Sequence, residues 1–158
     1  MDSIRKFLYF NSIEFPSTTK RNLMNISLMI IDDDPVHHKL IHIVVNNAKA
    51  NIKYQCYLQA SDAYSYILDN NHKRLLPNLI LLDLNMPLIS GWGFLELFEA
   101  INPLLERQID VIILTSSVNP ADKERASNYK CVKGFFNKPF TEAMLKDILS
   151  SSFISVKK

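Results

Sequence analysis

The chain has 158 residues and a formal net charge of +2, with 47% hydrophobic and 22% charged residues. This length and composition indicate one globular domain, and the near-neutral charge without a basic stripe argues against nucleic acid as a partner. No apolar run approaches the ~20 residues of a membrane-spanning helix, and the N-terminus lacks the features of a signal peptide, so we expect a cytoplasmic protein with no membrane partner. The two cysteines, Cys56 and Cys131, form no close-spaced motif and are expected to be reduced thiols.

Short apolar runs alternate with amphipathic segments from residue 27 onward. We expect strands over residues 28–31, 53–58, 79–84, 111–114 and 133–137. We expect helices over residues 35–48, 61–70, 91–101 and 120–129, and a last helix that begins after Thr141. This strict alternation predicts an α/β fold, a doubly wound parallel sheet of five strands with helices on both faces. We therefore assign residues 27–154 to one domain, residues 1–26 to an N-terminal extension that is a flexible leader or a docked helix, and residues 155–158 to a C-terminal tail.

The first predicted helix has clear start signals in Asp34, a capping residue, and Pro35, which fits the first helical position because it lacks an N–H. Its apolar face is expected to consist of Val36, Leu40, Ile43 and Val44. His38 and His42 have the spacing of a metal-binding pair, but no third ligand is apparent. We expect both histidines to lie on the solvated side of the helix.

Polar side chains stand where the predicted strands end: Asp32 and Asp33, then Asp83, then Thr115 and Ser116, and finally Lys138. The carboxyl ends of parallel strands meet at one edge of the sheet, where ligands bind. Clustered carboxylates repel each other unless a cation relieves the repulsion, and an all-oxygen ligand set suits Mg²⁺. A lysine and hydroxyl donors beside such a cation suit a phosphoryl group. The chain has no Gly-rich phosphate loop, so Asp83 itself is the candidate phosphoryl acceptor.

Four motifs in this order resemble those of the response-regulator receiver domain, the CheY-like phosphoacceptor family. They are Ile31-Asp32-Asp33, Leu82-Asp83-Leu84-Asn85-Met86-Pro87, Leu114-Thr115-Ser116 and Phe136-Asn137-Lys138-Pro139-Phe140. The resemblance extends from about residue 27 to 153. It implies the flavodoxin-like (βα)5 fold with strand order 2-1-3-4-5.

The resemblance also implies roles for the metal site. Asp83 is the acceptor of a phosphoryl group from a histidine kinase or a histidine phosphotransfer protein. Asp33 binds Mg²⁺ directly, Asp32 assists through water, and the backbone carbonyl of Asn85 is a further ligand. A domain of this kind is no general enzyme, because it catalyses only its own phosphorylation and dephosphorylation.

The same resemblance implies a switch. Lys138 pairs with Asp83 and then with the phosphoryl oxygens, while the Thr115 hydroxyl and the Ser116 backbone turn toward the phosphate. Phe135 occupies the position of the switch aromatic, and lacking a hydroxyl it reports by packing alone.

We therefore interpret the chain as a stand-alone receiver of a two-component phosphorelay. Its output is contact with an unknown downstream protein through the face of the fourth helix, fifth strand and last helix, or onward transfer of the phosphate. The sequence leaves open whether the phosphorylated form dimerises. The alternative is a non-phosphorylated pseudo-receiver that acts as an interaction scaffold. An aspartyl-nucleophile phosphatase is disfavoured, because it needs an acid two residues after the nucleophile, where Asn85 stands.

Overall fold

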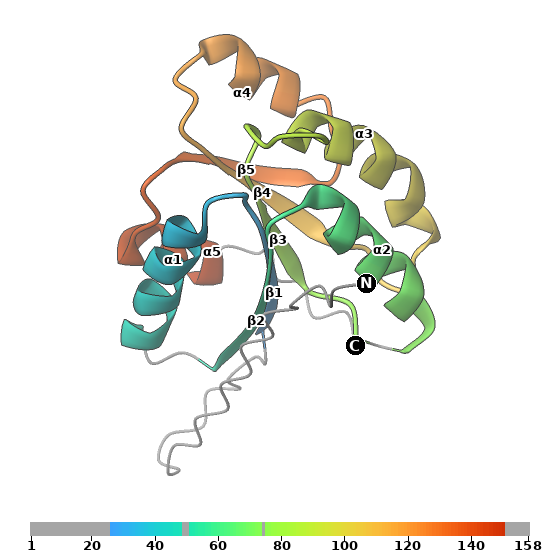
Figure 1. Cartoon of the computed structure of the whole chain (residues 1–158), viewed down its shortest axis with the longest axis horizontal. Coiled ribbons are helices and arrows are strands. Elements are labelled where there is room, and N and C mark those ends of the chain that lie inside the picture. The colour runs from blue at the N-terminus through green and yellow to red at the C-terminus, as the bar shows by residue number, and fades with distance from the viewer. Residues whose placement is uncertain (1–25, 49–50, 74, 151–158) are drawn as a thin grey trace, which may run out of the picture.

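The computed structural model describes residues 26–48, 51–73 and 75–150 (Figure 1). Its strands are β1 (Ile26–Ile31), β2 (Ile52–Tyr57), β3 (Leu79–Leu82), β4 (Asp110–Thr115) and β5 (Val132–Asn137). Its α-helices are α1 (Pro35–Asn47), α2 (Ala60–Asn70), α3 (Gly91–Ile101), α4 (Pro120–Ala126) and α5 (Glu142–Ser150). Short 3-10 turns follow α2 and α3, over Asn71–Lys73 and Asn102–Leu104. The predicted extension and tail fall almost wholly outside the described residues and stay predictions.

The five strands form one parallel sheet in the order β2-β1-β3-β4-β5. In Figure 1, α1 and α5 cover one face of this sheet, and α2 and α3 cover the other. The predicted doubly wound fold and its strand order are therefore confirmed.

Alternate residues of each central strand enter two separate cores. In β1, Met29 and Ile31 pack on the side of α2 and α3, whereas Leu28 and Ile30 pack on the side of α1 and α5. The two residue sets of β3 and β4 divide in the same way. Because both faces of the sheet are covered, these strands have continuous apolar sequences rather than alternating ones.

Side-chain caps fix the starts of α1 and α4, and the cap of α1 is the one that the sequence predicts. Asp34 accepts a hydrogen bond from the Val36 N–H at 2.8 Å, and Asn119 accepts one from the Ala121 N–H at 3.1 Å. Pro35 and Pro120 occupy the first helical positions. β1 and β4 therefore pass into α1 and α4 through defined turns at the carboxyl edge of the sheet.

The predicted apolar face of α1 is correct for Val44 and wrong for Val36 and Ile43. The structure buries the stripe of His37, Ile41, Val44 and Val45, whereas Val36 and Ile43 are 68% and 53% exposed. The sequence holds two overlapping apolar stripes on this helix, and contact with the sheet selects the one that contains a histidine. His38 and His42, expected to be solvated, are both partly buried as a result.

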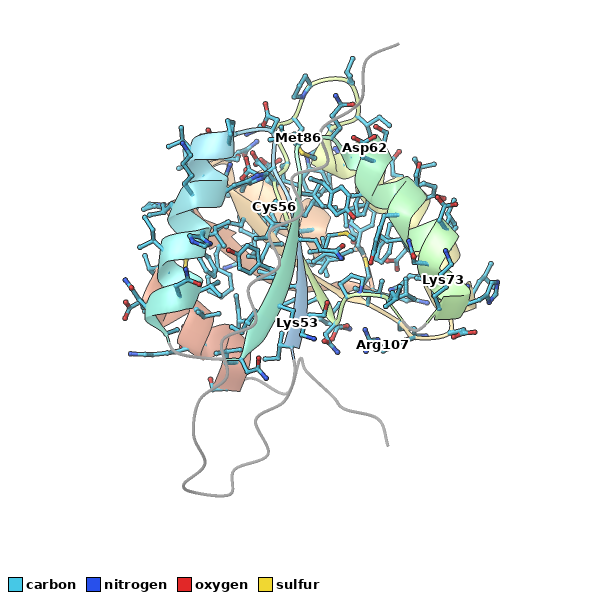
Figure 2. All side chains as sticks on the ribbon, turned by 60° about the horizontal axis from the view of Figure 1, so that its bottom comes forward. Lys53, Cys56, Asp62, Lys73, Met86 and Arg107 are labelled. Atoms are coloured by element: carbon cyan, nitrogen blue, oxygen red, sulfur yellow. The ribbon has the colours of Figure 1, made fainter. Side chains whose placement is uncertain are left out.

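Labelled side chains mark the two ends of the parallel strands. Figure 2 shows Asp62 and Met86 near the carboxyl edge, at the opposite end of the sheet from Lys53 and Arg107.

In the described part of the chain, no helix combines the length and apolar character needed to cross a bilayer.

Candidate functional site

The candidate site lies at the carboxyl edge of β1, β3, β4 and β5, where backbone hydrogen bonds extend past the strands. The Asp32 N–H donates to the Tyr57 carbonyl at 3.0 Å, and the Asp83 N–H donates to the Ile31 carbonyl at 2.9 Å. The Lys138 N–H likewise donates to the carbonyl of Thr115 at 2.9 Å. These bonds hold the backbones of the predicted site residues in a fixed mutual position.

Three carboxylates meet at this edge. Asp32 and Asp83 are 2% and 4% exposed, while Asp33 is exposed to solvent. One oxygen of each lies within 4.8 Å of the others, and within the described ranges this is the one cluster of three or more potential metal ligands of the His, Cys, Asp and Glu types. Hard, anionic oxygen donors of this kind fit Mg²⁺, which rarely takes a full set of protein ligands.

Lys138 joins two of these carboxylates. Its Nζ donates to Oδ2 of Asp32 and to Oδ2 of Asp83, both at 2.7 Å. One ammonium against three carboxylates leaves an excess of about two negative charges at the site. A divalent cation matches this excess.

The ionisation of the cluster follows from its contacts. Burial disfavours the charged form of Asp32, but hydrogen bonds from His37 and Lys138 outweigh burial and hold the pKa of Asp32 below its ordinary value. Burial likewise disfavours the ammonium of Lys138, but its contacts with Asp32 and Asp83 raise its pKa. Both groups are therefore charged at neutral pH.

The loop after Asp83 wraps closely around it. Oδ1 of Asp83 accepts a hydrogen bond from the Asn85 N–H at 3.2 Å, and the Gly91 N–H donates to the Leu84 carbonyl at 3.0 Å. Ser90 caps α3 by accepting a hydrogen bond from the Gly93 N–H at 3.2 Å. The start of α3 thus lies directly against the backbone of the acidic residue.

The remaining predicted residues lie at the end of β4, directly after it, or in β5. Thr115 is fully buried, and its Oγ1 accepts a hydrogen bond from the Ser117 N–H at 3.2 Å, whereas Ser116 is exposed. Phe135 is half-buried, lies opposite Ile113 in the sheet, and packs against the core on the side of α2 and α3. The structure therefore joins Asp32, Asp33, Asp83 and Lys138 by direct proximity, and brings Thr115 to Lys138 through the backbone.

One residue of this site is absent from the sequence-based prediction. His37 is buried, and its Nδ1 lies 2.5 Å from Oδ2 of Asp32. A signal for it exists in the sequence, because His37 shares helical spacing with Ile41 and Val44. A histidine on the buried stripe of a helix, one turn after an acidic pair, points toward that pair.

A doubly wound sheet with three carboxylates and a lysine at its carboxyl edge defines a class of phosphoacceptor domains, and comparison with known families agrees. Residues 28–150 match the family model described as response regulator receiver domain. The chain therefore belongs to the response regulator receiver family. Receiver domains are signalling domains of two-component systems rather than classical enzymes, with an acidic pocket for Mg²⁺, a kinase as phosphodonor and downstream targets.

Two curated relatives and one solved structure illustrate the similarity. The chain is 29% identical over 128 residues to the probable transcriptional regulator ycf29 of Porphyra purpurea, covering 81% of this chain and 56% of that protein. It is 25% identical over 129 residues to response regulator Rre1 of Synechocystis sp., covering 79% and 52%. The chain thus spans about half the length of these relatives. A two-component response regulator from Cytophaga hutchinsonii superimposes with a TM-score of 0.71 at 26% identity, covering 78% of this chain and 92% of that one.

Proposed function

We propose that this protein accepts a phosphoryl group on Asp83 from a phosphohistidine donor in a Mg²⁺-dependent reaction. The observation that carries the proposal is the cluster itself, in which Lys138 bridges Asp32 and Asp83 beside Asp33. The role of phosphodonor falls to a histidine kinase or a histidine phosphotransfer protein. The structure joins Cys56 and Cys131 in no disulfide, which is compatible with the cytoplasmic location that we propose.

The chemistry follows from the contacts of Asp83. An oxygen of its carboxylate attacks phosphorus, the new P–O bond forms as the P–N bond of the donor breaks, and the proton that the leaving imidazole needs comes from the donor side or from solvent. Lys138 holds Oδ2 of Asp83 and the Asn85 N–H holds Oδ1, so the carboxylate is oriented before the donor arrives. When Asp83 becomes an acyl phosphate it loses its charge, and the Lys138 ammonium is free to pair with phosphoryl oxygens.

Mg²⁺, when bound, would neutralise the charge that builds on the phosphoryl oxygens during transfer. The carboxylates of Asp32, Asp33 and Asp83 would hold it, together with the backbone carbonyl of Asn85. The need for a cation is consistent with the uncompensated negative charge of the cluster.

The signal would leave the site through Thr115, Ser116 and Phe135. Phosphorylation adds roughly −1.5 to −2 charges, which attract the Thr115 hydroxyl and the Ser116 N–H. Phe135 then follows inward on the neighbouring strand, and the face of α4, β5 and α5 changes its affinity for a downstream protein. Onward transfer of the phosphate is the other output open to the domain.

An apolar rim, defined as Val36, Leu88 and Val118, supports a protein rather than a metabolite as donor. These side chains are strongly exposed and lie on the segments that follow β1, β3 and β4, the strands that carry the site. We expect Leu88→Asp to slow transfer from a phosphorylated protein donor and to leave labelling by acetyl phosphate unchanged. The substitution suits the backbone, because Leu88 has a φ of 66°, where Asp is better tolerated than Leu.

Labelling with acetyl phosphate and Mg²⁺, followed by intact-mass measurement, tests the acceptor. We expect a phosphoryl increment on the wild type, none on Asp83→Asn, and a normal increment on Asp34→Asn. Asp34 is the matched control, because it adjoins the acidic pair but serves as the cap of α1, a role that Asn also fills. Equal labelling of Asp83→Asn would exclude Asp83, and no labelling of the wild type with either kind of donor would favour the pseudo-receiver scaffold.

A further inference from the structure

His37 is a buried side chain that the proposed phosphotransfer leaves without a role. It lies in the first turn of α1 and is 6% exposed. Its Nδ1 contacts Oδ2 of Asp32 at 2.5 Å, and among the described residues its Nε2 has no hydrogen-bond partner. Burial of an imidazole is unfavourable unless its polar atoms are paired, so the contact with Asp32 is what accounts for a histidine at this position.

The two oxygens of Asp32 are not equally available. Oδ2 accepts hydrogen bonds from His37 Nδ1–H and from Lys138 Nζ, and Oδ1 accepts one from the Asp34 N–H at 3.0 Å. A carboxylate offers two lone pairs on each oxygen. Oδ2 is therefore saturated by two donors, whereas Oδ1 keeps one lone pair.

We propose that His37 is a positioning residue of the cation site, which fixes the carboxylate of Asp32 so that Oδ2 serves Lys138 and Oδ1 alone is offered to the cation. The inference rests on the proposed function of this site. His37 is no ligand in this arrangement, because its Nδ1–H is used by Asp32. Its effect on the cation is exerted entirely through the orientation of that carboxylate.

Loss of the His37 donor has a defined consequence. Without the His37 donor, one lone pair of Oδ2 is free and the Asp32 carboxylate can rotate. Oδ2 can then compete with Oδ1 for the cation, and the contact between Oδ2 and Lys138 weakens. Removal of an outer partner that orients a metal ligand typically weakens metal affinity 10–100-fold. We expect a loss at the lower end of this range, because Asp33 and Asp83 are unaffected.

Three variants and a Mg²⁺ titration test the proposal. His37→Leu removes the donor at similar volume, whereas His37→Asn keeps an N–H donor near the position of Nδ1. His42→Leu is the matched control, since His42 lies on the same helix and pairs with the Tyr54 hydroxyl and the Asn46 amide. Mg²⁺ affinity is measured by calorimetry on the full chain without any phosphodonor, after circular dichroism has shown that each variant is folded.

We expect the Kd for Mg²⁺ to rise about tenfold in His37→Leu, to stay within about threefold of wild type in His37→Asn, and to be unchanged in His42→Leu. A spectroscopic signature accompanies this result, because the ¹⁵N resonances of the wild-type His37 ring should show the proton on Nδ1 and should shift when Mg²⁺ is added. Wild-type affinity in His37→Leu, an equal loss in His37→Asn, or no Mg²⁺ binding by the wild type would each overturn the proposal. Because no phosphodonor is present, failure of phosphorylation on Asp83 leaves this test unaffected.

Discussion

Gly91 is the position where the smallest substitution should do the most damage. A Cβ on Gly91 would lie 2.2 Å from the carbonyl oxygen of Asp83 and 2.7 Å from the Cα of Leu84. Both are backbone atoms, so no side chain can rotate away to make room. Gly91→Ala must therefore push α3 away from the backbone that carries the phosphoacceptor.

The cost follows from this overlap. The chain must open by about 1 Å, and overpacking of this kind costs about 1–3 kcal/mol. Alanine is better than glycine in a helix by up to about 1 kcal/mol, but less at the first helical position, so the gain does not offset the strain. We expect a net loss of about 2 kcal/mol, which corresponds to a melting temperature lower by roughly 6–10 °C in a domain of this size. A displacement of Asp83 by about 1 Å should also slow labelling by about 10²-fold.

Gly93→Ala is the control on the same helix. Its Cβ would meet only side-chain atoms, Cγ2 of Ile89 at 3.3 Å and Oγ of Ser90 at 3.8 Å, and we expect a stability change within about 0.5 kcal/mol. Thermal and urea unfolding measure stability, and intact mass after acetyl phosphate treatment measures labelling. If Gly91→Ala is as stable and as readily labelled as Gly93→Ala, the close approach to the Asp83 backbone is not what demands glycine.

Three further outcomes test the charges, the contact between α3 and α4, and the thiols. Lys138→Met should destabilise the metal-free protein by about 3 kcal/mol at neutral pH, because two buried carboxylates lose their shared ammonium. Stability from a carboxyl of lowered pKa is present above its unfolded pKa and lost as pH falls through the folded value, so this difference in urea unfolding should shrink in acid; a constant difference would contradict the reasoning. Arg125→Gln should cost no more than about 1 kcal/mol but should change the emission of Trp92, the one tryptophan, since the guanidinium lies 4.3 Å from the ring centroid; an unchanged spectrum would refute that contact. Burial raises the pKa of Cys56 to about 12 and also raises that of Cys131, so both should react with a thiol reagent about 10³-fold more slowly than in urea, and reaction at the unfolded rate would show that they are not buried thiols.

The fold could be predicted because its signals are local. The strands β1, β3 and β4 are short runs rich in branched apolar residues that end at or just before a polar one, and α1 and α4 begin at the recognisable caps Asp34 and Asn119. Alternation then requires parallel strands, and parallel strands bring their carboxyl ends to one edge. The proximity of Asp32, Asp83 and Lys138 therefore follows from topology before any coordinate is known.

The face of α1 could not be predicted in the same way. Val36, Leu40 and Ile43 form one stripe, whereas Ile41, Val44 and Val45 form another, and periodicity alone does not rank them. The structure buries the stripe that includes His37, because Ile41, Val44 and Val45 pack against the sheet and His37 finds its partner in Asp32. A rule that treats histidine as polar and exposed discards this stripe, although the contact is the most informative one on the helix.

The position of α4 lay beyond the sequence for a different reason. Trp92 stacks on Tyr129 with ring centroids 6.1 Å apart and lies beneath Arg125, which also pairs with Glu96 at 3.2 Å. Trp92 and Glu96 are one turn apart on α3, so their shared partner Arg125 is set by where α4 packs and not by any local pattern.

These contacts make α3 a link between the phosphoacceptor loop and α4. The helix starts against the Asp83 backbone at Gly91, and its later turns hold the segment from Arg125 onward, where Glu99 accepts hydrogen bonds from the N–H groups of Lys130 and Cys131 at 2.8 and 3.1 Å. A shift of the phosphoacceptor loop therefore meets a continuous set of contacts leading to α4, in parallel with the path through Thr115 and Phe135. Coupling along this route requires an element with two arrangements that both sites bias. The emission of Trp92 in wild type and Arg125→Gln, compared with and without a phosphoryl mimic, separates the two paths. If α3 carries the signal, the phosphoryl mimic changes the Trp92 emission more in wild type than in Arg125→Gln. If Thr115 and Phe135 alone carry the signal, the mimic has the same effect in both proteins.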